Sequence, residues 1–263
     1  CRGWGPFVCA AYECSTTTSD GVFQMTFDEM KARIAEGQGF IAALDQSGGS
    51  TPKALAGYGV AEDAWTTEDE MFGLIHEMRQ RIIESPCFGN GKVIGAILFE
   101  KTMEGACGGK SVPARLKERG IVPFLKVDKG LAEERDGAQL MKPNPGLEDM
   151  CNRARELGVF GTKMRSVIKS ANPVGIKEAV RQQFAEGARI LSCGLVPMLE
   201  PEYDITADDR AEGEKIMLEA IEEGLVALPE GQQIMLKLSI PKEAGIYGGC
   251  LLYTSDAADD SLR

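Results

Sequence analysis

The sequence is poor in the residues that build common metal, redox and membrane sites. His76 is the only histidine among 263 residues, so a histidine-based zinc site or a Ser-His-Asp triad is not expected. The eight cysteines include no Cys-x-x-Cys pair, and their spacing is typical of reduced cytosolic thiols. No apolar run approaches the roughly 18 residues that a helix needs to cross a membrane.

Basic residues are also in deficit. The 29 lysines and arginines face 40 aspartates and glutamates, which gives a net charge of −11. This balance argues against non-specific nucleic-acid binding, which depends on neutralising phosphates with cations. A site for a phosphorylated metabolite would have to be a local cluster of cations. Hydrophobic residues, by contrast, make up 43% of the chain, which is enough for one large α/β domain or two small ones.

The two ends of the chain differ from its middle. Residues 1–24 show no helical or strand period and lack the features of a signal peptide. A helix start follows, where Thr26 and Glu29 have the spacing of a capping box. We expect residues 1–24 to be a non-native or disordered extension and residues 25–249 to form the domain. Residues 250–263 contain CLLYTSDAADD, which is similar to a translated sequencing adapter, and we expect an artefactual tail there.

Six short apolar runs alternate with amphipathic segments in the middle of the chain. Their length and continuous apolarity favour strands that are buried on both faces of a parallel sheet. The runs are Phe40–Leu44, Val93–Phe99, Val122–Val127, Val159–Met164, Leu195–Leu199 and Ile234–Leu238. Between them, stripes at helical spacing predict helices packed on the sheet. These stripes are Met71, Leu74, Ile75, Met78 and Ile82 (after a second capping box, Thr67 and Glu70), then Ile176, Val180 and Phe184, and then Met217, Ile221 and Leu225.

The alternation of strands and helices indicates an α/β fold. A TIM barrel contains eight such units over about 250 residues. Six units that end near residue 240 therefore predict a TIM (β/α)8 barrel truncated after about six strands. An open doubly wound sheet fits the alternation as well, but no GxGxxG or GxxxxGK[ST] loop follows the first strand, which weakens its nucleotide-binding versions.

Charged residues close every one of the six predicted strands. In a barrel these carboxyl-terminal ends converge on one mouth, where active sites form, and side chains two residues apart share a face. The residues are Asp45, Glu100, Lys126 with Asp128, Lys163 with Arg165, Glu200 with Glu202, and Lys237. Three lysines in one small volume are expected to lower one another's pKa and to free an amine nucleophile.

A free amine suggests a particular chemistry. It attacks a ketone and forms an iminium, which accepts electrons when the neighbouring carbon–carbon bond breaks. The carboxylates Asp45, Glu200 and Glu202 are placed to move the protons. This chemistry requires no metal, in agreement with the single histidine.

Five segments, in order along the chain, resemble the class I, Schiff-base-forming fructose-bisphosphate aldolases, most closely their bacterial branch. The segments are FIAALDQSGGSTPKAL (40–55), FLKVDKG (124–130), FGTKMR (160–165), GLVPMLEPE (194–202) and MLKLSIP (235–241). The resemblance implies a TIM barrel that cleaves fructose 1,6-bisphosphate to dihydroxyacetone phosphate and glyceraldehyde 3-phosphate in glycolysis and gluconeogenesis. It implies no cofactor, a cytoplasmic location, no nucleic-acid or membrane partner, and is compatible with a homo-oligomer.

The resemblance also assigns roles. It implies that Lys237 forms the Schiff base, that Glu200 is the acid and base around it, that Lys163 assists proton transfer, and that Asp45 contacts the C4 hydroxyl. The substrate-binding residues that it implies are Lys126, Arg165, Glu202, Ser47, Ser50 and Lys53. Two features fit the bacterial branch, namely Gln46 and Met164 in place of a glutamate and a tryptophan of the animal enzymes.

Two alternatives remain open at this point. The family's strand-seven Ser-Gly-Gly phosphate loop and strand-eight arginine have no counterpart in residues 25–249. The chain could therefore be a non-catalytic fragment of such an enzyme, with unpaired strand edges that favour association. The other alternative is a class I aldolase for another ketose bisphosphate, such as tagatose 1,6-bisphosphate.

Overall fold

The computed structural model describes residues 25–47, 50–89 and 91–248, so the expectations for residues 1–24 and 250–263 lie outside it. Its centre is a sheet of six parallel strands. These are β1 (Phe40–Leu44), β2 (Val93–Leu98), β5 (Val122–Lys126), β7 (Gly161–Ile168), β8 (Val196–Tyr203) and β9 (Met235–Leu236), in that spatial order. The short β6 (Ala138–Gln139) adds to β7 in the antiparallel sense, and β3 (Ala106–Cys107) pairs with β4 (Lys110–Ser111) apart from the sheet.

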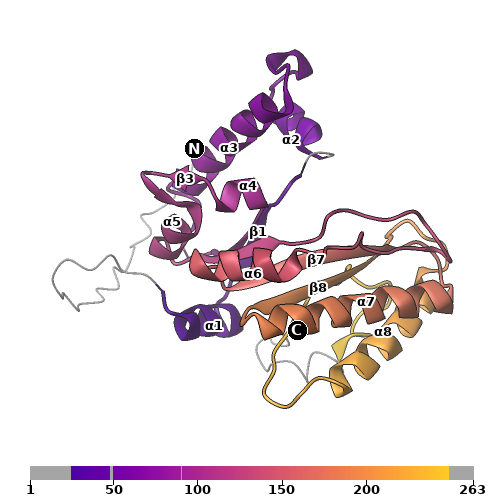
Figure 1. Cartoon of the computed structure of the whole chain (residues 1–263). Coiled ribbons are helices and arrows are strands. Elements are labelled where there is room, and N and C mark those ends of the chain that lie inside the picture. The colour runs from indigo at the N-terminus through magenta and orange to yellow at the C-terminus, as the bar shows by residue number, and fades with distance from the viewer. Residues whose placement is uncertain (1–24, 48–49, 90, 249–263) are drawn as a thin grey trace, which may run out of the picture.

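Helices connect the parallel strands, as an α/β fold requires. They are α1 (Phe27–Glu36), α2 (Thr51–Gly57), α3 (Glu68–Glu84), α4 (Glu100–Met103), α5 (Val112–Glu118), α6 (Leu147–Glu156), α7 (Pro173–Ser192) and α8 (Arg210–Val226), with a 3-10 turn at Glu62–Ala64. Helices α7 and α8 lie side by side against the β7–β8 half of the sheet (Figure 1). The six parallel strands and their helices form the predicted partial TIM barrel.

Both predicted capping boxes are present. Thr26 accepts a hydrogen bond from the Glu29 backbone N–H, and the Glu29 carboxylate accepts one from the Thr26 N–H at 2.7 Å. Thr67 and Glu70 repeat the arrangement at the start of α3. At the start of each helix, two backbone N–H groups that lack an intrahelical partner therefore donate to the side chains of the capping box.

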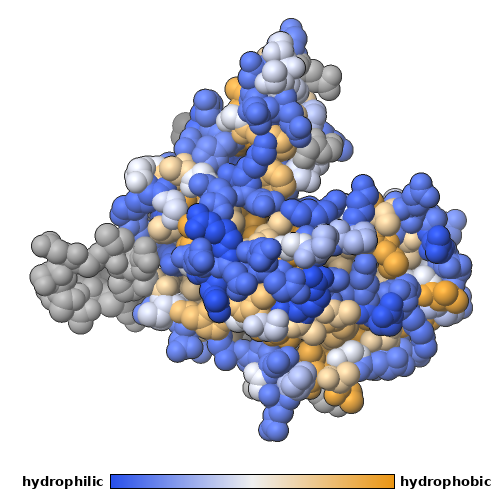
Figure 2. All heavy atoms as spheres, viewed as in Figure 1, coloured by the Kyte–Doolittle hydropathy of each residue, from blue (hydrophilic) through white to orange (hydrophobic). Residues whose placement is uncertain are grey.

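The outer face of the sheet holds the largest apolar core. Leu98 of β2, Leu125 of β5 and Leu199 of β8 pack there with Leu116 of α5 and Cys151 of α6. The opposite sides of these helices are hydrophilic, which gives the blue surface over α6 in Figure 2. The sheet therefore stays in place because amphipathic helices cover its outer face.

The inner face changes character along four of the six parallel strands, β5, β7, β8 and β9. Towards the amino-terminal end it is apolar, and α1 covers it: Phe124 and Met198 pack there with Met30 of the helix. Two residues further along, the same face becomes charged, because alternate residues of a strand point to the same side. The pairs are Phe124 then Lys126, Gly161 then Lys163, Met198 then Glu200, and Met235 then Lys237.

Several predicted boundaries need correction. Strands β7 and β8 run on to Ile168 and Tyr203, so Arg165, Glu200 and Glu202 lie within strands and not after them. The reason is continuous pairing, in which Arg165 is the register partner of Glu200. Strand β9, by contrast, covers only Met235–Leu236.

Two expectations about helical residues also change. In α3 the fully buried side is Met71, Phe72, Ile75, Arg79 and Ile83, whereas the predicted Leu74, Met78 and Ile82 are half-buried. Glu100 does not face the mouth but opens α4 and pairs with Lys129. The half-buried His76 is satisfied through its Nε2, 3.1 Å from the Ala106 carbonyl oxygen.

Candidate active site

Four charged residues form a continuous chain of ion pairs on the inner face. Lys163 Nζ lies 2.7 Å from Glu200 Oε2 and 3.3 Å from Asp45 Oδ2. Glu200 Oε1 accepts a hydrogen bond from Lys237 Nζ. We call the series Lys237–Glu200–Lys163–Asp45 the ion-pair chain. It joins the ends of β1 and β9 to β7 and β8 between them, so the four predicted catalytic residues lie together.

Burial differs along the ion-pair chain. The side chains of Glu200, Lys163 and Asp45 are 4%, 9% and 12% exposed, whereas that of Lys237 is 47% exposed. A charge held out of water needs a partner, and each of the three buried groups has one. Lys237 is thus the member that solvent or a ligand can reach directly.

The charge state of Lys163 differs from the expectation that the lysines lower one another's pKa. Burial by itself lowers the pKa of Lys163, but the carboxylates of Asp45, Glu200 and Asp128 together outweigh it and raise the pKa above its ordinary value. The expected mutual repulsion of the lysines does not dominate there, because carboxylates lie between the cations. Lys163 therefore remains an ammonium group.

Two further ion pairs flank the ion-pair chain. Lys126, the register partner of Lys163, bonds to the Asp128 carboxylate at 2.7 Å. Arg165 bonds to Glu202 at 2.9 Å, and both of these side chains are partly exposed, at 42% and 37%. The predicted substrate-binding residues Lys126, Arg165 and Glu202 thus adjoin the predicted catalytic ones.

The loop after β1 is only partly described. Ser47 and Ser50 lie in it, and the Ser47 carbonyl oxygen accepts a hydrogen bond from the Ser50 backbone N–H at 2.8 Å. Residues 48–49 are outside the described residues. Lys53 lies exposed on α2, and no hydrogen bond or ion pair of the described part of the molecule joins it to the ion-pair chain. Its substrate-binding role stays a prediction.

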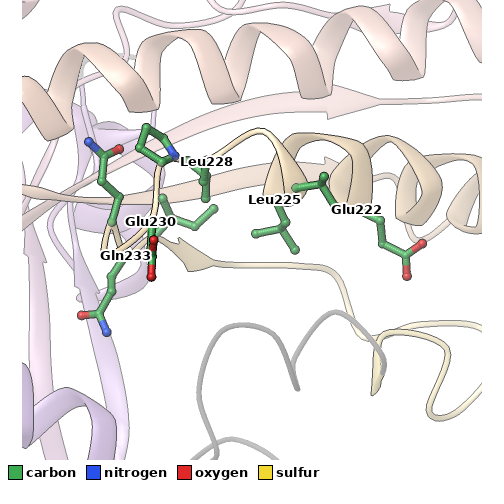
Figure 3. Close-up of a pocket in the computed structure, with 10 residues that line it drawn as sticks. Glu222, Leu225, Leu228, Glu230 and Gln233 are labelled. Atoms are coloured by element: carbon green, nitrogen blue, oxygen red, sulfur yellow. The ribbon is translucent and has the colours of Figure 1, made fainter.

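Two cavities near β9 differ in character. One, of about 700 Å³, opens beside the carboxyl-terminal end of the strand and is lined by Lys237, Glu200 and Glu202 among others. The other, of about 600 Å³, lies at the amino-terminal end, where Glu222, Leu225 and the 228–234 loop line it without any lysine or arginine (Figure 3). Cations that could pair with an anionic ligand line the first cavity and not the second.

Two polar residues that support the site were not predicted from the sequence. Arg79 of α3, 1% exposed, donates to the Gln46 carbonyl oxygen at 2.6 Å, next to Asp45. Gln183 of α7 is fully buried and contacts the main chain of Glu200. The sequence marks each of them only as a single polar residue inside an otherwise apolar helical stripe.

Some site types are not found among the described residues. Within residues 25–47, 50–89 and 91–248, no cluster of three or more histidine, cysteine, aspartate and glutamate side chains could hold a metal ion. No helix of that part is long and apolar enough to cross a membrane. The expectation of chemistry without a cofactor is left as a prediction.

Comparison with known proteins decides the family. A sequence model of the class I fructose-bisphosphate aldolases, a glycolytic family, matches residues 27–239. The chain belongs to this family. The bacterial branch and the truncation, in contrast, remain predictions about this aldolase-family chain.

One solved aldolase structure agrees with the fold. A fructose-bisphosphate aldolase from Plasmodium falciparum superposes with a TM-score of 0.64 and 21% sequence identity, over 81% of this chain and 63% of that enzyme. The chain thus spans less than two thirds of that enzyme's length. An arginine decarboxylase from Paramecium bursaria Chlorella virus aligns with a TM-score of only 0.38 and 12% identity, over 80% of this chain and 60% of its own.

Proposed function

We propose that this chain carries the catalytic machinery of a class I aldolase that cleaves fructose 1,6-bisphosphate through a Schiff base on Lys237. The observation that supports the proposal is the ion-pair chain. An exposed amine contacts a buried carboxylate, which in turn contacts a buried ammonium group. A nucleophile paired with a base that a third group orients is the usual arrangement of covalent catalysis.

The first half of the reaction uses Lys237 and Glu200. The Lys237 ammonium passes a proton to the Glu200 carboxylate, and the free amine attacks the C2 ketone to form a carbinolamine. Protonated Glu200 then gives the proton to the carbinolamine hydroxyl, which leaves as water, and the iminium remains. Lys163, held as an ammonium by its raised pKa, stays paired with Glu200 Oε2 and holds this carboxyl group in place.

The second half uses Asp45. Its carboxylate accepts the proton of the C4 hydroxyl, the C3–C4 bond breaks, and the electron pair moves to the iminium nitrogen to give an enamine. Glyceraldehyde 3-phosphate leaves first. Asp45 then returns its proton to C3 of the enamine, which restores the iminium, and addition of water to the iminium releases dihydroxyacetone phosphate and the Lys237 amine. Lys126 and Arg165 supply cations beside the site for an anionic substrate. We place this activity in the cytoplasm, as for a glycolytic enzyme.

Borohydride trapping tests the proposal. The chain is incubated with dihydroxyacetone phosphate and sodium borohydride, and the labelled peptide is located by mass spectrometry. We expect a reduced adduct on Lys237 and none in Lys237→Arg, which keeps the positive charge against Glu200 but cannot form the iminium. An adduct on another lysine, or no adduct at all, would contradict the proposal.

The substrate is tested separately. Fructose 1,6-bisphosphate and tagatose 1,6-bisphosphate differ in the orientation of one hydroxyl group, so the comparison of their kcat/KM values measures which orientation the site prefers. We expect faster cleavage of the fructose compound. A higher kcat/KM for the tagatose compound would identify that compound as the preferred substrate, and the proposed Schiff-base chemistry would still stand.

A further inference from the structure

Gln183 is a buried polar residue between helix α7 and the sheet. It lies in the middle of α7, and its side-chain amide is fully buried. Helix α7 packs on the outer face, where its Ile176 belongs to one apolar cluster with Ile168 and Tyr203 of the two longest strands. The ion-pair chain lies on the other face. A side chain of α7 can therefore reach Glu200 only through the main chain.

Gln183 makes this contact with both polar groups of the Glu200 main chain. Its Oε1 accepts a hydrogen bond from the Glu200 backbone N–H at 3.3 Å, and its Nε2 donates to the Glu200 carbonyl oxygen at 3.3 Å. The same Nε2 lies 3.1 Å from Ser166 Oγ and 3.4 Å from the Met164 carbonyl oxygen. One amide thus ties β8 to β7 at the level of Glu200.

The position of the Glu200 carboxylate needs such a restraint. Its two oxygens are contacted by different lysines, Lys163 within β7 and Lys237 beyond the two-residue β9. A shift of the main chain by a fraction of an ångström would lengthen one contact and shorten the other. Groups that hold a reacting residue in place are worth large factors in rate.

We propose that Gln183 is a positioning residue for Glu200, and that it fixes this carboxylate between the two lysines from the far side of the sheet. This role rests on the proposed Schiff-base function. Gln183 touches no reacting atom, and its effect is expected on the rate of iminium formation and not on substrate affinity.

The neighbouring glutamine supplies a matched control. Gln182 binds the Met141 backbone with the same pair of bonds, accepting from its N–H at 2.8 Å and donating to its carbonyl oxygen at 2.9 Å. Met141 is not a member of the ion-pair chain. Gln182→Met and Gln183→Met each remove a pair of main-chain hydrogen bonds made from the same helix, and Gln183→Met also removes the contacts to Ser166 and Met164. Only Gln183→Met should affect Glu200.

The experiment measures the rate of borohydride trapping by the full chain with dihydroxyacetone phosphate, at a temperature where circular dichroism shows every variant folded. Gln183→Met should slow trapping about ten- to a hundredfold with an unchanged half-saturating concentration. Gln182→Met should trap at the wild-type rate. Trapping by Gln183→Met at the wild-type rate, or equal slowing in both variants, would overturn the positioning role.

A third variant separates positioning from packing. In Gln183→Glu the ionised carboxylate can only accept hydrogen bonds, whereas the protonated acid can also donate to the Glu200 carbonyl oxygen. Its trapping rate should recover relative to wild type as the pH falls, and that of Gln183→Met should not. A constant ratio at every pH would count against the role. If the wild-type chain forms no Lys237 adduct, the proposed function fails and this role fails with it; loss of the Gln183 effect alone leaves the function intact.

Discussion

The middle of the sheet and its two edges hold different halves of the ion-pair chain. Lys163 and Glu200 lie on β7 and β8, which pair over eight residues each. Asp45 and Lys237 follow β1 and β9, which have five and two residues and one neighbour each in the described sheet. The sheet itself holds Lys163 and Glu200 in place. Asp45 and Lys237 depend instead on side-chain contacts outside the strand pairing.

The contacts at the edges show this dependence. After β1, the Gln46 carbonyl oxygen accepts a hydrogen bond from buried Arg79. After β9, Ser239 Oγ donates to the Tyr203 carbonyl oxygen at 2.8 Å, and the Lys242 backbone N–H donates to Glu214 at 2.8 Å. Short strands leave few ladder hydrogen bonds, so a polar anchor follows each of them. Changes in the centre should therefore affect stability and chemistry together, and changes at an edge should separate them.

Lys163→Met should have the largest effect. It removes the cation that two buried carboxylates share, and breaking a buried ion pair from one side costs roughly 3 to 5 kcal/mol. The cleavage rate should fall by at least about a hundredfold, because the proton-transfer partner is lost as well. Urea denaturation and steady-state kinetics measure the two effects. A variant as stable as wild type would show that Glu200 and Asp45 are adequately paired without Lys163.

Arg79→Met should have a smaller effect on stability, and it should affect cleavage and trapping differently. Burial lowers the pKa of Arg79 to about 10, against the opposing influence of Asp45, and its guanidinium also donates to Thr102 at 2.6 Å. The change leaves the partly buried Gln46 carbonyl oxygen without this donor. A fully buried unsatisfied group costs about 1–3 kcal/mol, so the loss should lie towards the lower end of that range.

The kinetic result of Arg79→Met sharpens the comparison. In the proposed mechanism Asp45 acts in bond cleavage and not in iminium formation, so the variant should cleave fructose 1,6-bisphosphate more slowly and still trap dihydroxyacetone phosphate on Lys237 at the wild-type rate. Lys163→Met is the control in which both rates should fall. Equal loss of trapping and cleavage in Arg79→Met would mean that the β1 edge is not independent of the centre.

The sequence predicted the central pair, Lys163 and Glu200, and the order of the strands. It did not predict the residues that support the site, Arg79 and Gln183. Lys163 and Glu200 follow apolar runs within recognisable segments, and all six runs became strands. The charge of Lys163 was not predictable, because it depends on Asp45 and Glu200, which are 118 and 37 residues away along the chain. Periodicity indicates which way a side chain points but not what meets it there.

The supports were missed for a related reason. Arg79 and Gln183 each lie within an apolar helical stripe, where a single polar residue carries no sign of its partner. Their partners are main-chain groups of Gln46 and Glu200, and every residue offers such groups. Only the packing of helices on the sheet identifies which main-chain group each side chain reaches.

The alkaline limb of stability should include a contribution from the centre of the sheet. The pKa of Lys163 in the folded protein lies above its ordinary value of 10.5. Its contribution to stability is therefore complete below about pH 10.5 and is lost as the pH rises through the higher, folded-state pKa. Denaturation curves from about pH 9 to pH 12 should show this loss in wild type. In Lys163→Met the loss from this group should be absent, and an unchanged alkaline limb would assign the effect to other residues.

The smallest effect is expected at the edge strand itself. Phe40 opens β1 and is 58% exposed, whereas Phe124, on the inner face of β5, is fully buried. Phe40→Ala should change the free energy of unfolding by less than about 0.5 kcal/mol, as for most exposed positions. Phe124→Ala should cost about 3–5 kcal/mol, because it leaves a cavity against Met198 and α1. Urea denaturation of the two variants measures the difference, and similar costs would show that β1 is packed as firmly as the centre of the sheet.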